Sequence, residues 1–148
     1  MKKPEKTILL LDDDKNLIRL LELILKTSHY HVIHATTVGA ALKKVRLKNP
    51  DLIISDIQLE GESGFDFFWG LQKICPKRMI PFIFISAYPD QDKIQRAAVM
   101  EHGGNNVFFL VKLFSPETIL KVIDVALGTR PREDLEQGME DLIPHPVD

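Results

Sequence analysis

Ile8-Leu9-Leu10-Leu11-Asp12-Asp13-Asp14 is the stretch that decides the fold, because four apolar residues run without a break into three aspartates. A continuous apolar run of this length is typical of a strand buried on both faces of a parallel sheet. Further runs of the same kind lie at residues 32–35, 52–54, 82–85 and 107–111. The five runs together predict five parallel strands.

The segments between these runs carry helical spacing. Leu17, Leu21 and Ile24 recur at steps of three and four, which places them on one face of a helix. Ser115-Pro116 favours the start of the last helix and Gly128 its end. Five successive strand–helix units with right-handed crossovers predict an α/β fold, a doubly wound five-stranded parallel sheet.

Composition narrows the class of protein. The 148 residues suit one domain, and 19 Lys and Arg against 21 Asp and Glu argue against direct nucleic-acid binding. A single cysteine, Cys75, excludes an intramolecular disulfide and a cysteine-rich metal site. No apolar stretch reaches the ~20 residues that span a bilayer, and run 8–11 is too short for a secretory signal. We therefore expect a cytoplasmic protein that contacts no membrane.

The last twenty residues differ from the rest. Segment 129–148 holds two arginines against six acidic residues, so we predict a domain over 1–128 and an acidic tail or linker over 129–148. Leu135, Met139 and either Leu142 or Ile143 could line one side of a short helix in this tail.

Polar groups stand where the predicted strands end. The first strand ends in Asp12-Asp13-Asp14, the third in Asp56, the fourth in Ser86 and the fifth in Lys112. Ligands of open parallel sheets bind beyond these carboxyl ends. Clustered carboxylates disfavour each other's ionisation, so a cation should compensate them, and Mg²⁺ prefers oxygen ligands. Metal, ammonium and hydroxyl together would bind a phosphoryl group, with a carboxylate as its nucleophile.

Four motifs in this order resemble the receiver domain of bacterial two-component response regulators. They are residues 8–14, residues 50–56 with the loop 61–64, residues 81–87, and residues 110–112 followed by 114–117. The resemblance runs from about Thr7 to Gly128. It implies a flavodoxin-like sheet with strand order 2-1-3-4-5.

The resemblance also implies a phosphoacceptor and a metal site. Asp56 would accept a phosphoryl group from the phosphohistidine of a sensor histidine kinase or a phosphotransfer protein. Asp12, Asp13 and Asp56 would hold Mg²⁺, and Gln58 would add its backbone carbonyl.

The remaining site residues follow from the same resemblance. Ser86 and Lys112 would bind the phosphoryl oxygens. Ser86 and Phe109 would form the switch pair, whose side chains change position together. The side chains of Gln58 and Tyr88 would tune the lifetime of the phosphorylated state.

The implied function is a phosphorylation-controlled switch, a regulator that assists only its own phosphorylation and dephosphorylation. Phosphorylation would stabilise one of two arrangements of the fourth helix, the fifth strand and the fifth helix. An output protein or a tethered effector domain would read that face, and a phosphorylation-dependent homodimer could form through it.

Two departures from the family pattern keep alternatives open. Leu113 follows Lys112 where the family usually has a proline in a cis peptide, so this peptide is either strained or trans. Residues 101–106 predict an elaborated turn before the fifth strand, longer than usual by a residue or two.

Three rival functions remain. The chain could be a degenerate receiver that works as a phosphorylation-independent docking module. It could be a phosphatase of the haloacid dehalogenase type with Asp12 as nucleophile, although the Thr or Val of that motif and a cap domain are missing. A flavodoxin-like nucleotide binder is disfavoured, because three aspartates in the first loop would repel a phosphate.

Overall fold

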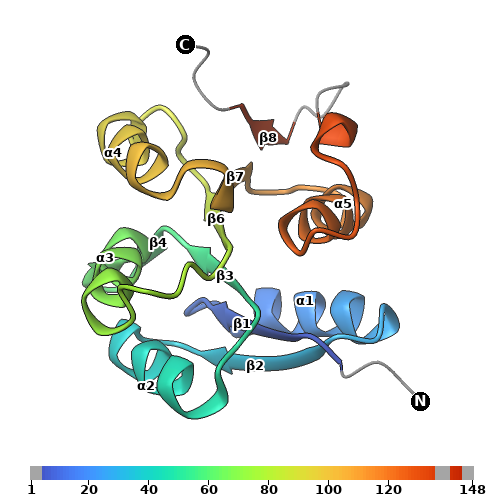
Figure 1. Cartoon of the computed structure of the whole chain (residues 1–148), viewed down its shortest axis with the longest axis horizontal. Coiled ribbons are helices and arrows are strands. Elements are labelled where there is room, and N and C mark those ends of the chain that lie inside the picture. Colours follow the sequence, from blue (N-terminus) through green and yellow to red (C-terminus); the bar gives the residue numbers. More distant parts are fainter. Residues whose placement is uncertain (1–4, 136–140, 145–148) are drawn as a thin grey trace.

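The computed structural model describes residues 5–135 and 141–144. Its main sheet has the strand order β2-β1-β3-β6-β7-β8 (Figure 1). The strands are β1 Thr7–Leu11, β2 His31–Ala35, β3 Leu52–Asp56, β6 Phe82–Ser86, β7 Val107–Val111 and β8 Leu142–Ile143. The first five are parallel and follow the predicted order 2-1-3-4-5, with β6 and β7 as the fourth and fifth strands. The predicted fold class is therefore confirmed.

Helices cover both faces of this sheet. They are α1 Lys15–Thr27, α2 Val38–Lys48, α3 Gly64–Ile74, α4 Lys93–Gly103 and α5 Pro116–Ala126. Helices α1 and α5 lie on one face, and α2, α3 and α4 lie on the other (Figure 1).

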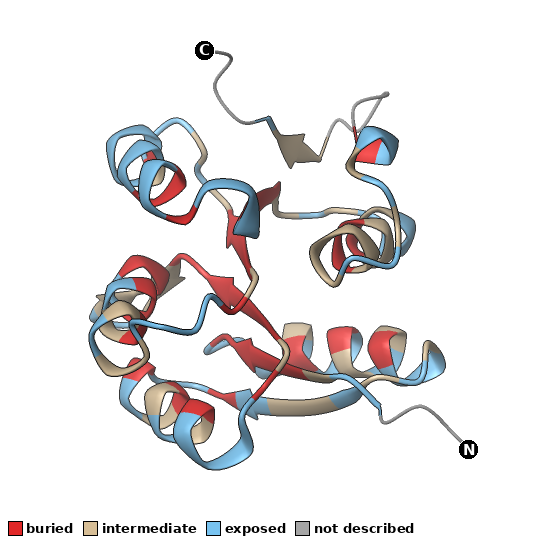
Figure 2. Cartoon of the chain, in the orientation of Figure 1, coloured by how far each residue is buried: buried red, intermediate tan, exposed pale blue. Residues whose placement is uncertain are grey.

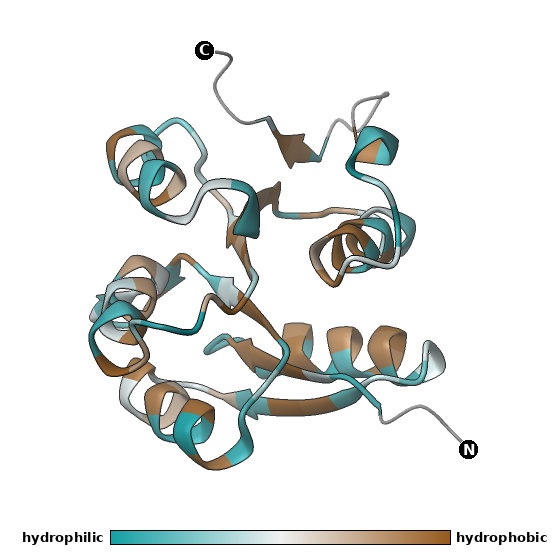
Figure 3. Cartoon of the chain, in the orientation of Figure 1, coloured by the Kyte–Doolittle hydropathy of each residue, from teal (hydrophilic) through white to brown (hydrophobic). Residues whose placement is uncertain are grey.

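The side chains of each strand alternate between the two layers. Leu9 and Leu11 of β1 pack with residues of α2, α3 and α4, whereas Ile8 and Leu10 pack with residues of α1 and α5. The central strands are accordingly buried and apolar along most of their length (Figures 2 and 3). Because both faces of these strands are buried, their apolar runs are continuous in the sequence and do not alternate with polar residues.

Polar caps fix where the helices begin. The carboxylate of Asp14 accepts hydrogen bonds from the amides of Asn16 and Leu17 at the start of α1. Ser63 and Asp66 form a reciprocal capping box on α3. Ser115 caps α5 as predicted, with Pro116 in its first turn. Because the first helix begins directly after the aspartate run, the carboxylates stay close to the end of β1.

The connection before β7 differs from its prediction. Residues 101–103 are the last turn of α4, so only the 3-10 turn Gly104–Asn106 connects this helix to the strand. Gly103 permits this arrangement because a Cβ at its position would clash with the side chain of Val107. The prediction of an elaborated turn over all six residues was therefore wrong.

The tail contributes a sixth strand that was not predicted. After a 3-10 turn at Arg132–Leu135, β8 pairs antiparallel with β7. Leu142 is thus in a strand and not in the expected short helix, while Met139 lies outside the described residues. The free edge of β7 offers backbone partners that override a weak local helical pattern. In the described ranges, 5–135 and 141–144, we find no helix with the length and apolar character needed to span a membrane.

Candidate functional site

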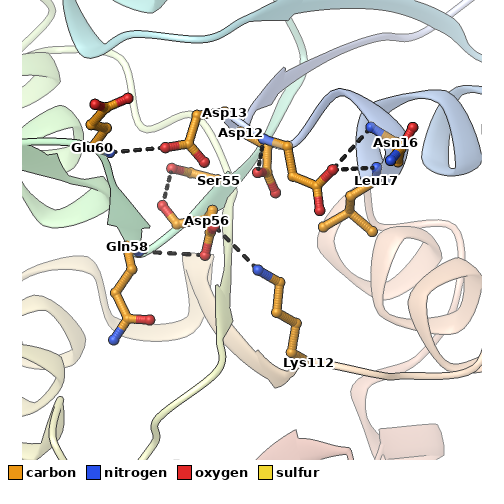
Figure 4. A network of polar contacts seen from close by, with 10 residues as sticks. Asp12, Asp13, Asn16, Leu17, Ser55, Asp56, Gln58, Glu60 and Lys112 are labelled. Carbon is orange, nitrogen blue, oxygen red and sulfur yellow. Dashed lines mark hydrogen bonds and ion pairs between the residues drawn. The ribbon is translucent and has the colours of Figure 1, made fainter.

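Three carboxylates meet at the carboxyl ends of β1 and β3. These strands are neighbours with Leu11 opposite Ser55, so the next residues on the two chain segments, Asp12 just after β1 and Asp56 at the end of β3, lie side by side. One oxygen each of Asp12, Asp13 and Asp56 lies within 4.8 Å of the others (Figure 4). The structure therefore brings together the three predicted metal ligands.

Only one of the two carboxylate oxygens of Asp12 has a hydrogen-bond partner among the described residues. Its side chain is only 3% exposed, and its Oδ1 accepts a hydrogen bond from the Asp14 amide at 2.8 Å. Its other oxygen, Oδ2, is buried and has no hydrogen-bond partner among the residues that the structure describes. A buried carboxylate oxygen without a donor is costly, so this atom is suited to a cation.

Burial also changes the protonation of two of these carboxylates. It raises the pKa of Asp12 from 3.8 to about 6; the Asp14 amide opposes this rise, and the neighbouring charge of Asp56 adds to it. Burial likewise raises the pKa of Asp56, and the Lys112 ammonium works in the opposite direction. Two desolvated carboxylates side by side therefore favour binding of positive charge.

Lys112 supplies one positive charge from the end of β7. Its Nζ lies 3.4 Å from Oδ2 of Asp56 (Figure 4). The Lys112–Leu113 peptide is trans, which settles the question that the sequence left open. Leu113 instead adopts a positive φ of 71° with its side chain 96% exposed. The lysine therefore reaches Asp56 without the proline that is usual in the family.

A short hairpin, β4 Gln58–Leu59 and β5 Glu62–Ser63, follows Asp56. The Gln58 amide donates to Oδ1 of Asp56 at 3.4 Å, and the Glu60 amide donates to Oδ2 of Asp13 at 2.9 Å (Figure 4). Gly64 then starts α3 against β3, where a Cβ would collide with the backbone oxygen of Asp56. The glycine thus lets the hairpin lie close to the carboxylates. The metal contact predicted for the Gln58 carbonyl stays a prediction.

Ser86 is not engaged by the carboxylate cluster. Its hydroxyl is fully buried and donates to Oδ2 of Asp92 at 2.6 Å. Asp92 was not singled out in the sequence, although an aspartate just before the helical spacing of residues 94–98 is a recognised start signal. The predicted contact between Ser86 and a phosphoryl oxygen stays a prediction.

The other two predicted residues lie further from the carboxylates. Phe109 is fully buried in the core, with its ring stacked on that of Phe84 at a centroid distance of 4.8 Å. Tyr88 is exposed in the segment between β6 and α4. Their predicted roles, in switching and in tuning the phosphoryl lifetime, stay predictions.

The donor set suits a hard divalent cation. Every candidate ligand atom is an oxygen, and carboxylate oxygens with water are the ligands that Mg²⁺ prefers. The unpartnered Oδ2 of Asp12 gives such an ion a specific place to bind. Asp12, Asp13 and Asp56 therefore fit the ion that the sequence predicts.

Comparisons with known proteins identify the family of the chain. The response regulator receiver domain family matches residues 8–124. The chain is 31% identical over 114 residues to the alkaline phosphatase synthesis transcriptional regulatory protein PhoP of Bacillus subtilis, covering 77% of this chain and 45% of that protein. It is 30% identical over 123 residues to the transcriptional regulatory protein GlrR of Escherichia coli, covering 81% and 26%. The chain thus spans less than half the length of either relative.

Solved structures give the same result. The chemotaxis response regulator CheY4 of Vibrio cholerae superposes with a TM-score of 0.72 at 26% identity, covering 84% of this chain and all of that one. A putative response regulator from Chloroflexus aurantiacus gives a TM-score of 0.72 at 26% identity, covering 84% of this chain and 99% of that one.

Proposed function

Because the chain belongs to the response regulator receiver domain family, we propose that it is a phosphorylation-controlled switch whose phosphoacceptor is Asp56. The grouping of carboxylates carries this proposal. Asp12, Asp13 and Asp56 present oxygens within 4.8 Å of one another, and Lys112 stands 3.4 Å from Asp56. A carboxylate with an ammonium and a cation site beside it is equipped to attack a phosphoryl group.

These residues carry the groups that the proposed reaction needs. An oxygen of Asp56 forms the new bond to phosphorus while the bond between phosphorus and the histidine nitrogen of the donor breaks. Lys112 stabilises the negative charge on the phosphoryl oxygens as the group transfers. Mg²⁺ held by Asp12, Asp13, Asp56 and the Gln58 carbonyl would supply the positive charge that lets an anionic group approach three carboxylates. The donor would be a sensor histidine kinase or a phosphotransfer protein.

The output would be read at the face formed by α4, β7 and α5. Ser86 ends β6, and Phe109 lies in β7, the strand that pairs with β6. An output protein, a tethered effector domain or a second copy of the chain would bind there in the phosphorylated state. The chain would act in the cytoplasm as a signalling domain and not as a classical enzyme. Residues 1–128 would form the receiver unit, and 129–148 its acidic tail.

One rival keeps a specific observation in its favour. Leu113 stands where the family usually has a proline, and the Ser86 hydroxyl already donates to Asp92. Both features favour the phosphorylation-independent docking module as the second candidate. The dehalogenase-type alternative, with Asp12 as nucleophile, loses its basis because the matched family is that of the receiver domains.

Incubation with Mg²⁺ and acetyl phosphate, followed by intact-mass measurement, tests the proposal. We expect one added phosphoryl group on the wild type, none on Asp56→Asn, and none on the wild type in chelator. Asp14→Asn is the matched control, because asparagine caps a helix as well as aspartate and Asp14 is outside the cluster. A wild type without an adduct would favour the docking module, and an adduct that persists on Asp56→Asn would exclude Asp56 as the acceptor.

A further inference from the structure

Asp92 is a buried carboxylate that the proposed phosphoryl chemistry does not use. Its side chain is 8% exposed, and it stands at the residue before α4. An aspartate at this position usually accepts hydrogen bonds from the first amides of the helix. Asp92 makes no such bond to α4, all of which the structure describes. Its Oδ2 accepts the Ser86 hydroxyl at 2.6 Å instead.

This hydrogen bond uses the only proton that the Ser86 side chain can donate. A serine hydroxyl has one hydrogen, so it serves one acceptor at a time. Asp56 stands opposite Ile85 in the paired strands β3 and β6, which puts Ser86 one residue beyond the phosphoacceptor. A phosphoryl oxygen on Asp56 could take the Ser86 proton only if the bond to Asp92 breaks.

Breaking that bond leaves a carboxylate buried without its donor. An unpaired buried charge is expensive, so Asp92 would have to find water or another donor. We propose that Asp92 is a positioning residue that competes with the phosphoryl group for the Ser86 hydroxyl and thereby couples phosphorylation of Asp56 to the start of α4. This inference rests on the proposed function of Asp56.

Contacts on the first turn of α4 show what such a movement would displace. The backbone oxygen of Asp92 accepts the Arg96 amide at 2.8 Å. The Arg96 guanidinium donates to the backbone oxygen of Pro89 at 2.7 Å and lies 6.0 Å from the centre of the Phe109 ring. A shift of Asp92 would therefore reach the preceding loop, the first turn of α4 and the predicted switch aromatic.

A double-mutant cycle tests the competition directly. Beryllofluoride with Mg²⁺, a stand-in for the phosphoryl group, is titrated into the wild type, Asp92→Ala, Ser86→Ala and the double variant. We expect Asp92→Ala to bind about tenfold more tightly than the wild type, because Ser86 is then free to donate to the ligand. In the Ser86→Ala background the same substitution should leave the affinity unchanged.

A second readout covers the case in which Asp92→Ala does not fold. Asp92→Asn keeps an acceptor but removes the charge, and it should also tighten binding only when Ser86 is present. In the wild type, beryllofluoride should shift the NMR signal of the Arg96 amide, and Ser86→Ala should reduce that shift.

The outcomes separate this inference from the proposed function. Equal affinities of the wild type and Asp92→Ala, or the same change in both backgrounds, would overturn the competition while leaving Asp56 as the acceptor. A wild type that binds no beryllofluoride would overturn the proposed function, and the competition with it.

Discussion

The site has two halves that differ in the hydrogen bonding of their buried carboxylates. In the acidic half, Asp12, Asp13 and Asp56, one buried oxygen of Asp12 finds no partner among the described residues. In the hydroxyl half, Ser86 and Asp92, the buried carboxylate has its donor at 2.6 Å. The difference teaches that burial of a polar group does not by itself mark a binding site. A buried polar atom without a hydrogen-bond partner indicates a place for a ligand. A buried hydrogen bond that is already formed is a contact that a ligand must displace.

The two halves should differ most in whether a substitution raises or lowers the free energy of unfolding. In metal-free protein at neutral pH, Asp12→Asn should raise the free energy of unfolding by on the order of 2 kcal/mol, because it removes an unpaired buried charge. The wild-type pKa of Asp12 rises from 3.8 to about 6 on folding, so the folded state binds the proton more tightly. Wild-type stability should therefore fall as pH rises from about 4 to about 6.

Urea unfolding in chelator at several pH values measures this effect. The fall in stability should be smaller in Asp12→Asn than in the wild type. Added Mg²⁺ should stabilise the wild type and have much less effect on the variant, because only the folded wild type holds the ion. Parallel pH curves for the two proteins, or a destabilised variant in chelator, would contradict the unpaired state of Asp12.

The hydroxyl half should respond in the opposite direction. Asp92→Ala should lower the free energy of unfolding by about 1–3 kcal/mol, because the buried Ser86 hydroxyl loses its acceptor. Ser86→Ala with Asp92→Ala should cost less than the sum of the two single changes. Additive losses in the double variant would show that the hydrogen bond does not couple the two residues.

The smallest effect is expected at the tail, where a carboxylate is both bonded and partly exposed. Asp141 accepts hydrogen bonds from the Ser115 amide at 3.3 Å and the Thr118 hydroxyl at 3.4 Å. Its backbone oxygen also accepts the Val111 amide at 2.7 Å, next to β8. Asp141→Ala should lower the unfolding free energy by about 1 kcal/mol.

Thermal unfolding of Asp141→Ala checks this, with Asp134→Ala as the matched control. Asp134 is exposed and pairs with Arg130, so its loss should cost less. Equal losses for the two variants would mean that the carboxylate of Asp141 does not hold the tail against β7.

The sequence predicted those parts of the molecule that depend on local pattern and strand order. Apolar runs located the five parallel strands, and the residues that end them, including Asp12, Asp56 and Lys112, lie together because parallel strands share one edge. Strand β8 was missed because Leu142 and Ile143 form a strand only where the edge of β7 lies beside them. Two residues carry too little pattern to show this.

The sequence could not give the direction of individual hydrogen bonds. Ser86 was correctly placed at the end of β6, but its choice of Asp92 depends on how the following loop folds back. The positive φ of Leu113 was equally hidden, since leucine adopts this conformation rarely and the sequence gives no sign of it. These details decide how the site works, and they arise from tertiary contacts.

The most direct test of the account is to locate the phosphoryl group on the chain. After reaction with acetyl phosphate and Mg²⁺, borohydride reduction converts an aspartyl phosphate to homoserine, which peptide mass spectrometry places at a single residue. We predict homoserine at position 56 and none in protein kept in chelator. Homoserine at position 12 or 13, or labelling at position 56 that does not depend on Mg²⁺, would contradict the account.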